Sequence, residues 1–180
     1  MRRSGFNIMT RLVGLVKPLT GYMILAVGMG MIGHLCASFI TIFGGYAILR
    51  VLRPEGTPDL KVLFAAVLIF ALIRGFLRYA EQACNHFIAF KLLALIRDKI
   101  FGALRRLCPA KLEGKDKGNL ISVITSDIEL LEVFYAHTIS PVCIAFLFSG
   151  FMVAFIGSYH VALGLLAFTA YMVVGVVIPL

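Results

Sequence analysis

The chain has 180 residues, of which 61% are hydrophobic and only 14% are charged, and its mean hydropathy is +0.97. A soluble domain carries about 25% charged residues, so this composition excludes a soluble protein. The net charge of +8 does not indicate nucleic-acid binding here, because the basic residues cluster at the ends of apolar segments, where they set membrane topology. The apolar runs are long and lack period-two alternation, which predicts an all-α membrane protein.

The first seventeen residues contain four Lys and Arg residues and no acidic residue. Their apolar side chains can share one helical face: Phe6, Ile8, Met9, Leu12, Val13 and Val16. This pattern favours an amphipathic helix over residues 1–17 that lies in the membrane interface. A disordered basic tail is the alternative.

No residue is charged from Leu19 to Leu49, which predicts a first membrane-spanning helix at about 19–49. At ~1.5 Å per residue this helix is about 46 Å long, whereas the hydrocarbon core is ~30 Å thick, so the helix is tilted or protrudes. His34 either lines a polar cavity or hydrogen-bonds to a neighbouring helix. The segment 50–61, with two prolines and a glycine, connects this helix to the next.

The second helix is predicted at about 62–108, because no helix breaker occurs between these positions. Such a helix is about 69 Å long, roughly twice the hydrocarbon thickness. Its last ~20 residues alternate apolar positions with basic ones and therefore extend out of the membrane into the cytosol.

Polar residues interrupt the middle of this helix: Arg74, Arg78, Glu81, Asn85 and His86. Positions 74, 78, 81 and 85 fall on one helical face, and Arg78 is spaced to pair with Glu81. Charges at membrane depth are costly unless they face a protein interior or water. The stripe therefore predicts a substrate cavity; alternatively, the arginines reach the interface and the stripe only ties helices together.

Pro109 ends the second helix, and the segment 109–118 forms a tight polar turn. Apolar spacing resumes at Ile121 and predicts a third helix at about 119–156, kinked at Pro141. A short turn at 157–160 and an uncharged fourth helix at 161–180 follow. Because this last helix has no polar flank, we expect the sequence to be the first part of a longer protein.

Twelve Lys and Arg residues lie in residues 1–17 and 91–117, against three in the 50–61 connection and none in 157–160. This asymmetry predicts that the N-terminus and the 109–118 turn face the cytosol. The chain lacks the phosphate-binding motif G-x-x-x-x-G-K-[ST] and any other catalytic motif, so it is not expected to hydrolyse ATP by itself. Its four cysteines lie in separate segments without a C-x-x-C motif, so no metal site is expected.

The layout resembles the membrane domain of ABC exporters that have six long helices per domain. The segment Leu107 to Asp127, with Pro109 and Gly118-Asn-Leu-Ile-Ser122, is similar to their first intracellular loop. The resemblance implies that this loop couples the helices to ATPase domains through Ala110, Lys111, Leu112, Glu113, Gly114, Lys115, Asp116 and Lys117. It also implies ATP and Mg²⁺ at a nucleotide-binding domain outside this chain, and a second exporter subunit in a homo- or heterodimer.

A narrower likeness is to the exporter subunits needed for cytochrome bd assembly, which are linked to export of cysteine or glutathione and to haem. It is carried by Arg74, Arg78-Tyr79, Glu81, His86, Arg97 and Ile139-Ser140-Pro141, whereas Ala80 and Gln82 depart from that family's pattern. By this resemblance His86 would be a haem ligand, and the alternative is a histidine that hydrogen-bonds where helices pack. The family also implies a bacterial inner membrane, with membrane lipid as a partner.

The sequence therefore predicts the permease part of an ATP-driven exporter that moves a small molecule by alternating access. The basic stripe favours an anionic or zwitterionic cargo. The alternative is a stand-alone membrane scaffold or assembly protein that docks a cytosolic partner at the 109–118 turn. A downstream reading frame with two more spans and a P-loop would distinguish the exporter from the scaffold.

Overall fold

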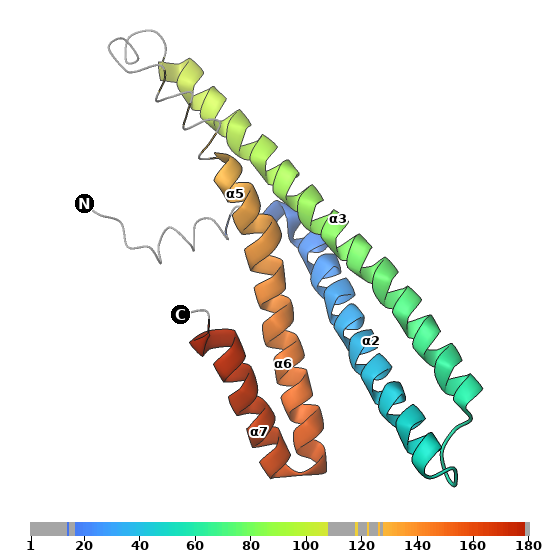
Figure 1. Cartoon of the computed structure of the whole chain (residues 1–180). Coiled ribbons are helices and arrows are strands. Elements are labelled where there is room, and N and C mark those ends of the chain that lie inside the picture. Colours follow the sequence, from blue (N-terminus) through green and yellow to red (C-terminus); the bar gives the residue numbers. More distant parts are fainter. Residues whose placement is uncertain are drawn as a thin grey trace. The chain divides into compact units, whose positions relative to one another are not determined.

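The computed structural model describes residues 17–107 and 128–178, together with the single residues Gly14, Gly118, Ser122 and Ser126. Within this part of the chain the regular elements are helices (Figure 1). The α-helices are α2 (Thr20–Leu52), α3 (Leu60–Leu107), α5 (Ile128–Phe134), α6 (Ser140–Tyr159) and α7 (Val161–Met172). Shorter elements are the 3₁₀ turn η1 (Lys17–Leu19) and the π-helices η3 (Tyr135–Ile139) and η4 (Val173–Val177). The predicted all-α fold is confirmed.

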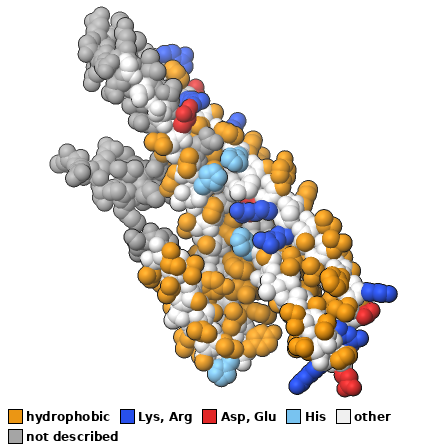
Figure 2. All heavy atoms as spheres, in the orientation of Figure 1, with side chains coloured by type: hydrophobic (Ala, Val, Ile, Leu, Met, Phe, Trp, Pro, Cys, Tyr) orange, Lys and Arg blue, Asp and Glu red, His pale blue; other side chains and the backbone are white. Residues whose placement is uncertain are grey.

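Three helical stretches are long and apolar enough to cross a membrane, namely Lys17–Leu52, Leu60–Arg106 and Glu129–Tyr159. A fourth apolar stretch, Val161–Val177, is shorter. Hydrophobic side chains cover most of the face shown in Figure 2, and many large ones are exposed on the helices. Such surfaces face lipid or other membrane helices, so the prediction of an integral membrane protein is confirmed.

The length of α3 exceeds what a bilayer requires. Its 48 residues correspond to about 72 Å, more than twice the ~30 Å hydrocarbon core. Apart from Lys61 at its start, the basic residues of α3 outside its middle gather toward its C-terminal end: Lys91, Arg97, Lys99, Arg105 and Arg106. Because side chains of this kind remain hydrated, the C-terminal end of α3 is the one that we expect to leave the membrane.

The chain forms two compact units, which we describe separately. Unit 1 consists of Met1–Met29 and Arg78–Ser140, and unit 2 consists of Gly30–Leu77 and Pro141–Leu180. In unit 1 the second half of α3 runs antiparallel to α5 and η3 (Figure 1). The core between these helices and η1, which precedes α2, consists of Leu19, Ile88, Ala89, Leu92, Tyr135 and Ala136.

Unit 2 contains the loop between α2 and α3. Phe70 of α3 packs against Phe39 and Phe43 of α2, with ring centroids 5.3 and 5.6 Å apart. Arg50, at the end of α2, donates hydrogen bonds to the carbonyl oxygens of Pro54 and Thr57. The loop is therefore held against the end of the helix by a side chain rather than by packing.

The α6–α7 turn, also in unit 2, is shorter than the predicted turn at 157–160. Helix α6 continues through Tyr159, and α7 begins at Val161, so only His160 is non-helical. The Nδ1 atom of His160 accepts a hydrogen bond from the backbone N–H of Ala162 (3.2 Å) and caps α7. The turn can be this short because Gly157 and Gly164 bring the two backbones into contact.

The kink at Pro141 stays a prediction, but the helical geometry changes just before this residue. The π-helix η3 lies directly before α6, in which Pro141 is the second residue. Proline has no N–H to donate to the preceding turn, and a π-helical turn is one way in which a helix absorbs such a missing bond. The helix therefore continues through the proline instead of ending there.

Two predicted features fall outside the described residues. The interfacial helix at 1–17 is described only at Gly14 and Lys17. The coupling residues 110–117 are not described, and the third helix is described from Ile128 onward.

Candidate functional site

The predicted stripe on α3 is divided between the two units. Arg74 belongs to unit 2, where its side chain is exposed. The other members lie together in unit 1: Arg78, Glu81, Asn85 and His86. The site described below is therefore the part of the stripe in unit 1, and Arg74 remains a member by its sequence spacing alone.

Arg78 and Glu81 form the ion pair that their spacing predicted. Nη1 of Arg78 donates to both carboxylate oxygens of Glu81, at 3.0 Å to Oε1 and 2.8 Å to Oε2. The Glu81 side chain is only 2% exposed, whereas that of Arg78 is 54% exposed. The carboxylate is thus buried in a membrane-spanning helix, and its negative charge is compensated by a guanidinium that also reaches the surface.

Asn85 lies one helical turn after Glu81 and is also buried. Its Oδ1 and Nδ2 atoms have no hydrogen-bond partner among the described residues, and the same is true of Oγ of Ser140. A buried polar group left without a partner costs about 1–3 kcal/mol. From the sequence, Ser140 stood out only as part of the Ile139-Ser140-Pro141 motif, and its burial was not predicted.

His86 is partly buried and contacts two rings in unit 1. It lies edge to face against His137, with centroids 5.6 Å apart and an interplanar angle of 80°, and its centroid is 6.0 Å from that of Phe90. These contacts place His86 where helices of unit 1 pack, and its expected role as a haem ligand stays a prediction. No group of three or more potential metal ligands comes together among the described residues.

His34, the other histidine singled out in the sequence, lies in unit 2. Its Nδ1 atom is 2.8 Å from the carbonyl oxygen of Gly30, one turn earlier in the same helix. Its ring packs against Phe148 of α6, with centroids 5.3 Å apart. Among the described residues, the imidazole therefore bonds within α2 and contacts the neighbouring helix by packing.

One further ion pair joins the charged end of α3 to α5 in unit 1. Nη2 of Arg97 lies 3.8 Å from Oε1 of Glu129, and both side chains are largely exposed. An exposed pair of this kind contributes little to stability.

A ring contact joins α2 to α3 in unit 1. Tyr22 of α2 packs against Phe87 of α3, with centroids 4.9 Å apart. The stripe thus lies on a helix that both neighbouring segments of unit 1 hold in place.

Residues 23–178 match the family model of the ABC transporter transmembrane region. The chain belongs to this family. The resemblance to ABC exporters drawn from the loop and stripe residues is thereby confirmed at the level of the family. In this transmembrane region, Arg78, Glu81 and Asn85 lie within the matched residues, as does the predicted coupling segment 110–117.

Curated relatives of this ABC transporter transmembrane region include two permeases. A "Probable ABC transporter ATP-binding/permease protein" of Haemophilus influenzae is 44% identical over all 180 residues of the chain, which cover 33% of that protein. The "Glutathione/L-cysteine transport system ATP-binding/permease protein CydD" of Bacillus subtilis is 25% identical over 148 residues, which are 80% of this chain and 25% of that protein. The chain thus spans about a third or less of the length of these relatives.

Proposed function

We propose that this chain is the permease part of an ABC exporter that moves a small anionic or zwitterionic molecule across the membrane. The observation that carries the proposal is the buried Glu81 carboxylate, held by Arg78 in the membrane-spanning helix α3. An ionised pair at such a place costs free energy, and pairs of this kind mark the paths of polar solutes in membrane proteins. The family match favours this function over a stand-alone scaffold.

The two members of the pair have different proposed roles. Nη1 of Arg78 is occupied by Glu81, which leaves the donors on Nη2 and Nε to bind a carboxylate of the cargo. Glu81 fixes the direction of the guanidinium and makes the empty site nearly neutral. Asn85 lies on the same face of α3 but is buried in the structure, so it would offer its donor and acceptor to the cargo only after the helices have moved. Arg74 and His86 are proposed as further members from their positions in the stripe.

The proposed driving force is ATP hydrolysis outside this chain. ATP and Mg²⁺ would bind to nucleotide-binding domains that contact residues 110–117, with a second exporter subunit completing the transporter. Both relatives are named as ATP-binding/permease proteins, which supports this arrangement. Movement of the 110–117 segment would tilt α3 and the helix after it as rods and expose the stripe alternately to the two sides.

The name of one relative suggests which cargoes to assay first. The Bacillus subtilis protein is named for transport of glutathione and L-cysteine, and both molecules carry an ammonium and at least one carboxylate. They match the charge that the Arg78–Glu81 pair is proposed to recognise. The proposed location is the inner membrane of a bacterium, with the N-terminus in the cytosol, as the distribution of Lys and Arg predicts.

Transport by the full-length exporter tests the proposed role of the pair. We expect Arg78→Ala and Glu81→Ala to reduce the initial transport rate per folded molecule at least about tenfold, because each loses a charge-assisted contact worth about 1.5–3 kcal/mol. Arg78→Lys should transport at an intermediate rate, since lysine keeps the charge but not the planar donors. Lys61→Ala, which removes an exposed charge at the start of the same helix, is the control. Unchanged rate and cargo selection in both alanine variants would refute the role.

A further inference from the structure

Unit 1 contains two buried polar side chains that have no described hydrogen-bond partner. Asn85 of α3 is 1% exposed, and Ser140, the first residue of α6, is 0% exposed. Together they contribute three such atoms: Nδ2 and Oδ1 of Asn85, and Oγ of Ser140. Elsewhere on this face of α3 the buried polar group, Glu81, is paired with Arg78.

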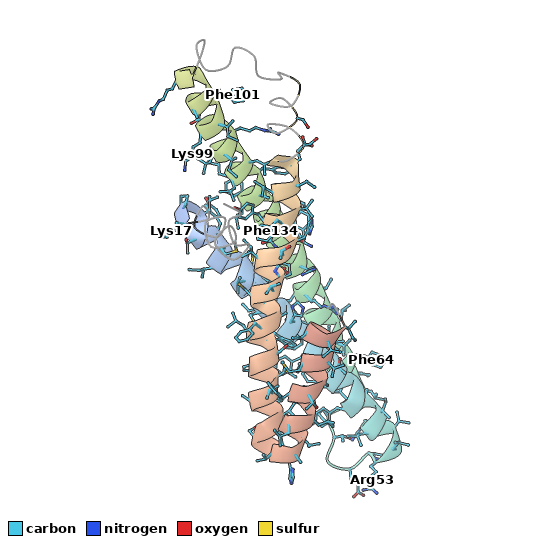
Figure 3. All side chains as sticks on the ribbon, turned by 90° about the vertical axis from the view of Figure 1, so that its left-hand side faces the viewer. Lys17, Arg53, Phe64, Lys99, Phe101 and Phe134 are labelled. Atoms are coloured by element: carbon cyan, nitrogen blue, oxygen red, sulfur yellow. The ribbon has the colours of Figure 1, made fainter. Side chains whose placement is uncertain are left out.

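The register of the two helices places these side chains at the same level. The helices run antiparallel in unit 1 (Figures 1 and 3), and Ala89 and Ala136 belong to one core cluster. Asn85 lies one turn before Ala89, and Ser140 lies one turn after Ala136. Because the two helices are antiparallel, both steps go the same way along the helix axes, and Asn85 and Ser140 lie at the same level. The ring contact between His86 and His137 agrees with this register to within one helical turn.

The chemistry of the three atoms defines the guest that they can bind. They offer an amide NH₂ group with two N–H donors, one amide oxygen and one hydroxyl, which is a mixture of donors and acceptors without a formal charge. A cation would require more oxygen ligands, and an anion would require more donors. Pro141, next to Ser140, has no N–H group, so the turn before it retains a carbonyl group that proline cannot satisfy. Water both donates and accepts, and buried waters typically make about three hydrogen bonds.

We propose that Asn85 and Ser140 bind a buried water molecule that links α3 to the start of α6. In a membrane there is no bulk water to satisfy such groups, and ordered waters fill this role beside prolines in spanning helices. The water site belongs to the resting protein and does not depend on the identity of the cargo. It adds a polar link between two helices beside the apolar core of unit 1.

A double-mutant cycle on the full-length transporter without added cargo tests the proposal. We expect Asn85→Leu and Ser140→Ala each to lower the midpoint of thermal unfolding by on the order of a few degrees, because each leaves the water or the other side chain without a partner. The double variant should lose less than the sum of the two, because it removes all the groups that share the water. Ser38→Ala is the control, since Oγ of Ser38 already bonds to the carbonyl oxygen of His34 in its own helix.

Two results would overturn the water site. If either single substitution raises the midpoint of thermal unfolding, Asn85 and Ser140 are unsatisfied and bind no water. If the effects of the two substitutions simply add, the two side chains do not share a water. A cryo-EM map that resolves ordered water provides an independent reading. Density for one water between Asn85 and Ser140 in the cargo-free transporter is expected, and density for a larger solute at this position would assign the pair to cargo binding instead.

Discussion

Replacement of Arg78 by methionine is expected to lower the free energy of unfolding by about 2–3 kcal/mol. Methionine replaces the aliphatic stem of Arg78 with an apolar side chain of similar length. The substitution leaves the carboxylate of Glu81, whose side chain is 2% exposed, without its cation. Loss of one partner from a fully buried pair costs ~3–5 kcal/mol, and the expected loss is smaller here because Arg78 is half exposed and its charge is screened. Unfolding by heat and by denaturant in detergent measures the change.

The matched control also removes the negative charge of Glu81, which Arg78→Met leaves without a partner. In the double variant Arg78→Met with Glu81→Gln, position 81 carries a neutral amide of nearly the same shape, so most of the lost stability should return. Glu81→Gln alone should cost less than Arg78→Met alone, because it leaves the remaining charge on the half-exposed residue. If Arg78→Met is as stable as the parent protein, or if the double variant is no better than this single one, Glu81 is not held as the structure shows.

Gly164→Ala is expected to destabilise the α6–α7 turn by about 1–3 kcal/mol through overpacking. A Cβ atom at position 164 would lie 2.7 Å from Cα of Gly157 and 3.3 Å from its backbone nitrogen. These are backbone atoms, so the helices must separate rather than a side chain rotate. Equilibrium unfolding and protease resistance of the full-length protein both report on the turn.

Two glycines of the neighbouring helix α6 serve as comparisons for this substitution in α7. Gly157→Ala should cost much less, because its Cβ atom would meet Cα of Gly164 at 3.6 Å, an ordinary contact. Gly150→Ala should be neutral or slightly stabilising, because nothing lies within 4 Å of its Cβ position and alanine favours the helix by up to ~1 kcal/mol. Equal effects of all three substitutions would contradict the close approach at Gly164.

The features that depend on a single helix were predictable from the sequence. Without a breaker between Leu60 and Leu107, α3 had to be much longer than a bilayer is thick, and the structure confirms this. The Arg78–Glu81 pair was predictable for the same reason, because residues three apart on a helix are neighbours whatever else surrounds them.

The features that depend on two helices were not predictable. The sequence placed Arg74, Arg78, Glu81 and Asn85 on one face, but which of them is buried depends on the segments that pack against α3. The burial of Ser140 and the contact between Gly157 and Gly164 likewise require knowledge of a partner helix. The turn predicted at 157–160 is too long, because Gly157 lies within α6 and allows close packing against Gly164.

In the proposed function, α3 carries the 109–118 segment out of the membrane into the cytosol, where ATPase domains would move it. Labelling of single cysteines by a membrane-impermeant thiol reagent in intact cells tests this claim most directly, in a full-length variant without its native cysteines. Lys115→Cys should react only after the membrane is permeabilised, whereas Glu55→Cys, in the loop between α2 and α3, should react in intact cells. Reaction of Lys115→Cys in intact cells, with Glu55→Cys protected, would contradict the account.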